Sequence, residues 1–84
     1  MPQHKSELET LIEEEKRLVA REYQSEAWAG GISDGIETEI MAEAALETAM
    51  REVVLTVGEE KALEFVDTLR RKVVEGALVE HTLQ

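Results

Sequence analysis

The sequence predicts an all-α fold, and three observations carry that prediction. Apolar residues recur at helical spacing along most of the chain. The one run rich in β-branched residues, Val53 to Val57, continues such a helical pattern and shows no strand alternation. The sole proline is Pro2. We therefore expect one all-helical domain over residues 1–84, an antiparallel helical hairpin plus a third, shorter helix.

The first helix is expected over residues 6–28. Ser6 and Glu9 form the S-x-x-E pattern of a capping box, in which each side chain satisfies a backbone amide at the helix start. The glycine pair Gly30-Gly31 is expected to end this helix. Its apolar stripe consists of Leu8, Leu11, Ile12, Leu18, Val19 and Tyr23.

The second helix is expected over residues 34–57, after a short glycine-rich loop. Asp34 is the expected N-cap, with Glu37 at the third helical position to complete a second capping box. Gly58 is the expected left-handed stop. Because the loop is short, the first two helices should run antiparallel or cross steeply.

The third helix is expected over residues 59–75. Glu59 and Glu60 suit the positive N-terminal end of its dipole, and the basic residues 70–72 suit its C-terminal end. Gly76 is expected to close it. The core face consists of Ala62, Phe65, Val66, Leu69 and Val73. The tail 77–84 carries enough apolar residues to dock on other helices but not to fold alone.

The second helix is apolar on nearly all sides, which is typical of a buried helix. One face holds Ala42, Ala45, Leu46, Ala49, Met50, Val53 and Val57. The other face holds Ile36, Ile40, Ala44, Val54 and Leu55. A chain of 84 residues has little else to cover both faces. The sequence therefore predicts an oligomeric helical bundle, with Ile36, Ile40, Val54 and Leu55 at the interface.

Composition restricts the partners and the compartment. Nineteen acidic and nine basic residues give a formal charge of −10, which repels nucleic acid and anionic membranes and attracts basic partners or cations. No cysteine is present, so disulfides and thiolate metal sites are excluded. The charged sequence after Met1 shows neither a signal peptide nor a membrane span. We expect a cytoplasmic protein that binds neither membranes nor nucleic acid directly.

Three carboxylates of the first helix fall inside its apolar stripe. Glu15, Glu22 and Glu26 lie between the two rows of apolar residues, as carboxylates do in di-metal helical bundles. Such sites usually add a Glu-x-x-His pair, which is absent, and His4 and His81 lie near the termini. A buried carboxyl with a raised pKa could also act as a general acid.

The alternative interpretation places these glutamates along a seam between two packing surfaces. There they extend to solvent or pair with Arg51, Arg70 or Arg71 of a neighbouring helix. On this interpretation the chain holds no metal and no cofactor. We adopt it and keep the three glutamates as candidates for a metal site.

The second helix also carries an acidic ridge. Glu39, Glu43 and Glu47 repeat every four residues, with Arg51 next in line. Such a ridge can be an ordinary solvated face, or it can imitate nucleic acid toward a basic partner. No serine has a histidine or lysine base at a suitable spacing, and no phosphate-binding glycine motif is present. The sequence therefore predicts a protein that is not an enzyme.

One further pattern extends over residues 35–78. It consists of Gly35-Ile36, Ala45-Leu46, Ala49, Gly58-Glu59-Glu60, Leu69, Val73 and Gly76. In this pattern the chain resembles small uncharacterised all-helical bacterial proteins of unknown function, and the resemblance implies an all-helical fold and no known activity.

The leading functional hypothesis is a small interaction or regulatory protein whose partner is a second copy of itself, or another protein. One alternative is an acidic nucleic-acid mimic that inhibits a basic partner. The other is a helical bundle that binds a metal through carboxylates.

Overall fold

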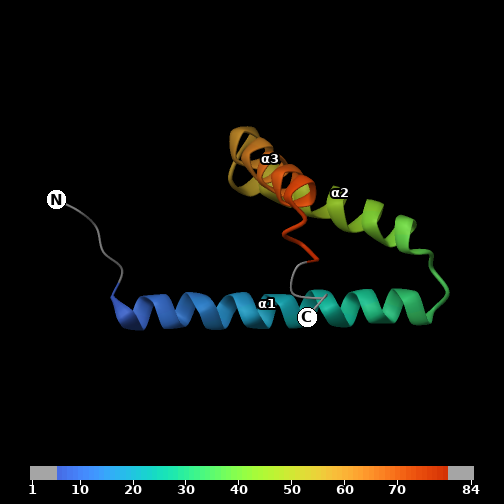
Figure 1. Ribbon diagram of the computed structural model, residues 1–84, viewed down its shortest axis with the longest axis horizontal. Helices are drawn as coiled ribbons and strands as arrows, with labels where there is room; N and C mark the ends of the chain where they lie inside the picture. Colours follow the sequence, from blue (N-terminus) through green and yellow to red (C-terminus); the bar gives the residue numbers. More distant parts are fainter. Residues whose placement is uncertain (1–5, 80–84) are drawn as a thin grey trace. The chain divides into compact units, whose positions relative to one another are not determined.

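The computed structural model describes residues 6–79, which form three α-helices and no strand (Figure 1). These are α1 (Glu7–Ser33), α2 (Thr38–Thr56) and α3 (Glu59–Glu75). The chain divides into two compact units, residues 1–42 (unit 1) and residues 43–84 (unit 2). The predicted all-α class is confirmed. The single-domain organisation and the antiparallel pairing of the first two helices stay predictions.

Helix α1 begins with the capping box that the sequence predicts. The Ser6 hydroxyl accepts a hydrogen bond from the Glu9 amide at 3.1 Å, and the Ser6 amide donates to the Glu9 carboxylate at 3.0 Å. Ser6 has extended backbone angles, as an N-cap residue should. Two of the amides left unpaired at a helix start are thereby satisfied.

Helix α1 ends five residues later than residue 28, so the predicted stop at the glycine pair is wrong. Both glycines lie inside the helix, which continues to Ser33. Glycine lowers helix stability but ends a helix only where it adopts a positive φ, and here that residue is Gly35 at 87°. The Gly35 amide donates to the Ile32 carbonyl and the Ile36 amide to the Gly31 carbonyl, which completes a Schellman motif.

The predicted start of the second helix is also wrong. Asp34 is the C-cap of α1 and not an N-cap, and α2 begins four residues later, at Thr38. The Glu37 carbonyl accepts the first helical hydrogen bond, from the Met41 amide at 3.0 Å. Glu37 therefore occupies the cap position, and no second capping box forms. Residues 34–36 form the Schellman turn that ends α1, and Glu37 follows as the cap of α2. The sequence pattern did not distinguish this turn from a helix start.

Met41 packs over Gly31 at the corner between α1 and the first turn of α2. A Cβ atom at Gly31 would overlap the Met41 thioether, whereas a Cβ at Gly30 would meet nothing within 4 Å. Gly31, Met41 and Ala42 are half-buried. The second glycine thus permits a close approach within unit 1, and the first does not.

Helix α3 spans the residues that the sequence predicts. Val57 and Gly58 alone separate it from α2. Gly58 has φ 108° and ψ 162°, a positive-φ conformation but not the expected left-handed helical one. Gly76 closes α3 in the left-handed conformation, with φ 73° and a second Schellman motif from the Gly76 and Ala77 amides.

The described residues have almost no core. Ala62, in the first turn of α3, is 5% exposed and is the only buried residue among residues 6–79. The sequence predicted Ala62 as part of a clean core face, but the other members of that face are not buried.

The two glycines of α1 provide a matched pair of substitutions. Gly30→Ala should raise the free energy of unfolding by about 1 kcal/mol, because alanine is the better helix former and its Cβ meets open space. Gly31→Ala should raise the free energy of unfolding by less, or should lower it, because its Cβ meets Met41. Unfolding followed by circular dichroism measures both.

The Met41→Ala background isolates the cause. Removing the thioether should restore to Gly31→Ala the stabilisation that Gly30→Ala shows. Equal effects of the two glycine substitutions in the unaltered chain would contradict the close approach at Gly31.

Candidate interaction surface

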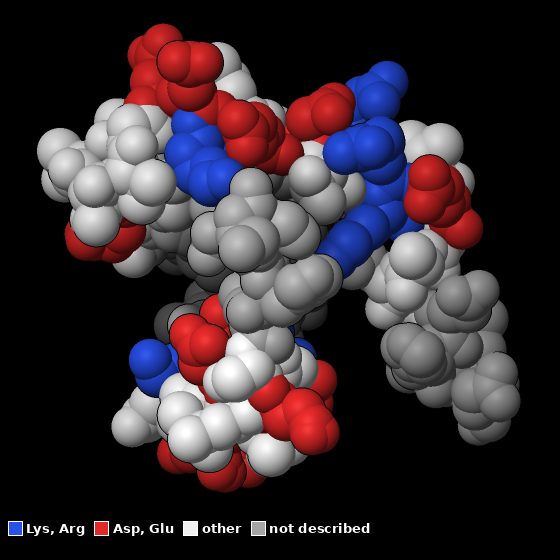
Figure 2. Space-filling model, turned by 90° about the vertical axis from the view of Figure 1, so that its left-hand side faces the viewer, with Lys and Arg blue, Asp and Glu red and all other residues white. Residues whose placement is uncertain are grey.

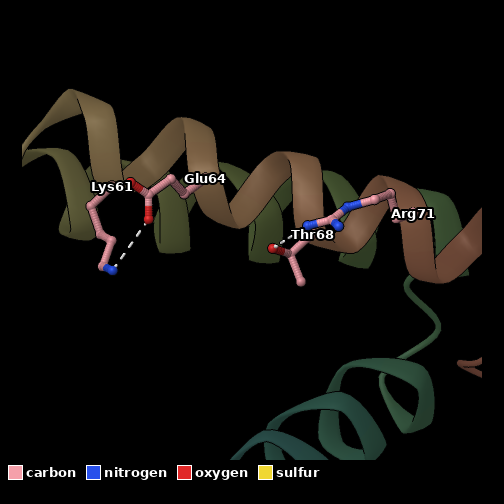
Figure 3. Close-up of polar contacts among 4 residues, drawn as sticks. All are labelled: Lys61, Glu64, Thr68 and Arg71. Carbon is pink, nitrogen blue, oxygen red and sulfur yellow. Dashed lines mark hydrogen bonds and ion pairs between the residues drawn. The ribbon is translucent and has the colours of Figure 1, made fainter. Parts of the chain in front are cut away.

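A shallow apolar groove of about 450 Å³ lies between α2 and α3 in unit 2. The two helices run side by side, joined by two residues (Figures 1 and 3). Residues in the first half of α3 lie beside residues in the second half of α2, as in an antiparallel pair. The groove is lined by Ala49, Met50 and Val53 of α2 and by Phe65, Thr68, Leu69 and Lys72 of α3.

The groove is built from the apolar faces that the sequence assigned to the two helices. Met50, Val53 and Thr68 are half-buried. Phe65 keeps 46% of its surface exposed and Leu69 keeps 38%. Helix α2 therefore covers only part of the apolar stripe of α3, and a further element is needed to cover the rest.

The residues predicted at the interface are exposed. Ile36 is 38% exposed, Ile40 51%, Val54 43% and Leu55 75%. Ile36 lies in the corner before α2, and the other three lie on α2. Ile40 and Val54 are close to four whole turns apart and so share one side of this helix. This side is distinct from the one that lines the groove.

The apolar stripe of α1 is exposed along its length, and no residue of this helix is buried. Glu15 lies within the stripe, because it shares one hollow with Leu11 and Leu18 and a second with Leu11 and Ile12. Glu22 and Glu26 follow at helical spacing on the same side. The exposed fractions are 66% for Leu8, 63% for Leu11, 46% for Ile12, 49% for Leu18, 39% for Val19 and 68% for Tyr23.

The structure does not gather the three candidate ligand residues into a metal site. Among residues 6–79, no group of three or more histidine, aspartate or glutamate side chains could hold a metal ion. Glu15 and Glu22 are two turns apart on one helix, about 10 Å along its axis. His4 and His81 lie outside the described residues.

The ion pairs of the described residues are local. Arg17 and Glu13 are 4.0 Å apart, and Arg71 lies 3.5 Å from Asp67. Within α3, Lys61 donates to Glu64 at 3.3 Å, and Arg71 also donates to Thr68 at 3.5 Å (Figure 3). All are exposed pairs between residues three or four apart, so they contribute little to stability.

The acidic ridge of α2 is a solvated face. Glu39, Glu43, Glu47 and Arg51 are all exposed, and across residues 6–79 none of them forms an ion pair. Figure 2 shows acidic and basic side chains beside one another on the face drawn. The α1 glutamates belong to unit 1 and Arg51, Arg70 and Arg71 to unit 2, so their pairing stays a prediction.

No family model, no curated protein and no solved structure matches this chain. In the part of the chain that the structure describes, no helix has the length and apolarity needed to cross a membrane.

Sequence reasoning missed two groove residues, Thr68 and Lys72. Thr68 is polar and was not counted in the apolar face that the sequence predicted for its helix. Lys72 was assigned to the helix dipole as one of three basic residues. The spacing along the helix could have identified them, since Lys72 lies one turn after Thr68 and three residues after Leu69, on the same side of the helix.

Divalent cations should not stabilise the protein, because three exposed glutamates spaced along one helix cannot surround one ion. The measurement is the melting temperature with ferrous, manganese or calcium ions at millimolar concentration, against a magnesium control. A rise of more than about 3 °C that Glu15→Gln abolishes would show that an assembly brings these carboxylates together.

Proposed function

We propose that this chain is a non-catalytic helical interaction protein that works as a homo-oligomer. The observation that carries the proposal is the distribution of apolar surface. Among residues 6–79 only Ala62 is buried, while large apolar side chains on all three helices are 37–75% exposed. Contiguous apolar surface of this kind marks a protein interaction site.

The energetics of folding support association. Ordering each residue costs about 1–2 kcal/mol of backbone entropy, and fully burying a large apolar side chain contributes only about 1.5–3 kcal/mol. A chain that buries one alanine recovers little of that cost by itself. No cysteine is present to form a disulfide, so a second chain is the ordinary source of further burial.

A second copy is the favoured partner because each helix has a face still to be covered. The α2–α3 groove, the α1 stripe and the Ile40 side of α2 all belong to one chain, so two copies offer each other three apolar surfaces. A different protein that supplies an apolar helix would also cover these faces. A cytoplasmic location belongs to this proposal as well.

Two charges placed on the outer side of α2 should dissociate the oligomer. The variant Ile40→Asp with Val54→Asp buries two unpaired charges in an apolar seam, which costs several kcal/mol. The dissociation constant should rise at least about 100-fold. Light scattering after size exclusion, over a concentration series, measures the change in molar mass.

The matched control is Thr38→Asp with Thr48→Asp, which adds the same charge at exposed polar positions of the same helix. This control should leave the mass unchanged. A 9.4 kDa mass for the unaltered chain at all concentrations would contradict homo-oligomerisation. An unchanged mass for the isoleucine–valine variant would remove the Ile40 side from the interface.

The acidic nucleic-acid mimic has less support, because the acidic residues of the chain are dispersed among lysines and arginines. Salt separates the two functions. A complex held by the ridge weakens steeply as salt screens the charges, whereas apolar association of two chains of charge −10 is maintained or strengthened.

A further inference from the structure

The groove between α2 and α3 carries a cation that has no ion-pair partner among residues 6–79. Lys72 lines the groove and makes no ion pair within residues 6–79. Lys61 and Arg71 on the same helix are engaged, with Glu64 and with Asp67. The segment Thr68–Val74 holds three basic residues and no acidic one. An occupant of this groove should therefore be apolar and should bring a negative charge to the level of Lys72.

The apolar stripe of α1 has this combination. The α1 stripe alternates apolar residues with Glu15 and Glu22, and neither carboxylate is ion-paired within residues 6–79. Packing two α1 stripes on each other would place these carboxylates against apolar side chains or against one another, which is unfavourable. Packing α1 on the groove places a carboxylate beside a lysine. Charge complementarity therefore selects α1 as the occupant.

Helix lengths favour an α1 from a second chain. At 1.5 Å per residue, the 27 residues of α1 extend about 40 Å and the 19 residues of α2 about 28 Å. Four residues join them, so an α1 folded back along its own α2 would extend about 12 Å beyond it. That overhang contains Leu8, Leu11 and Ile12, the start of the stripe. Helix α2 of the same chain is too short to cover this segment.

We propose that the α2–α3 groove receives α1 of a second copy, with Glu15 or Glu22 of that copy beside Lys72. The inference rests on the proposed homo-oligomer and names its contact. Two chains that exchange α1 in this way use both surfaces twice, as a two-fold interface requires. One carboxylate of the stripe then has a cationic partner in the groove.

Zero-length crosslinking of the full-length, unaltered protein tests this contact. A carbodiimide joins a lysine amine to a carboxylate only where the two groups touch. Equal amounts of unlabelled and ¹⁵N-labelled protein are mixed and left to exchange subunits. The mixture is then crosslinked, digested and analysed by mass spectrometry. We expect peptides that join Lys72 to Glu15 or Glu22, one labelled and the other not.

The control variants separate reactivity from charge. Lys72→Arg keeps the charge and removes the amine, so the crosslink should disappear while the oligomer mass is unchanged. Lys72→Glu should raise the dissociation constant about tenfold or more, because it places like charges together. The Lys61–Glu64 crosslink within α3 should form in every sample and never join two labels.

Each outcome separates this contact from the proposed function. Crosslinks from Lys72 to α1 that never mix labels would show that α1 covers the groove of its own chain, which overturns exchange between copies. An oligomeric mass without any crosslink from Lys72 to α1 would overturn the contact and leave the homo-oligomer standing. A monomeric mass would overturn both.

Discussion

A helix buries its apolar stripe only by packing it on another element, and this chain has three helices with which to do so. Within residues 43–79, α2 and α3 pack together but leave Phe65 and Leu69 more than a third exposed. Within residues 6–42, Met41 lies close to Gly31 where the end of α1 meets the start of α2. The shortage of burial within each unit is therefore the constraint on which the rest of the structure depends, and it is the basis of the proposed association.

The polar interactions have a different role from the apolar ones. A capping box at Ser6 fixes the start of α1, and Schellman motifs at Gly35 and Gly76 fix the ends of α1 and α3, whereas ion pairs within a helix add little. None of these contacts joins one helix to another. The carboxylates inside the α1 stripe differ, because desolvating them without a cation is costly. They can therefore exclude wrong packings of α1, which an all-apolar stripe would allow.

The sequence predicted what depends on local patterns and missed what depends on competition between neighbouring signals. The helical class, the Ser6 cap and the bounds of α3 follow from spacing and from residues with one conformational role. The stop of α1 did not, because three glycines compete for it and only Gly35 takes the positive φ. Asp34 was misassigned for the same reason, since one residue can end a helix or begin the next. The groove could not be read from either helix alone, because Lys72 becomes part of it only when α2 and α3 pack.

In the proposed homo-oligomer, folding and association are coupled. A chain with one buried residue among residues 6–79 has little stability of its own, and every partner surface it binds stabilises the bound form by mass action. The charge of −10 opposes assembly at long range, while the apolar faces and the few unpaired cations favour it at contact. Salt and protein concentration should then shift folding and assembly together. In such a protein, the residues that select the partner are also the residues that complete the fold.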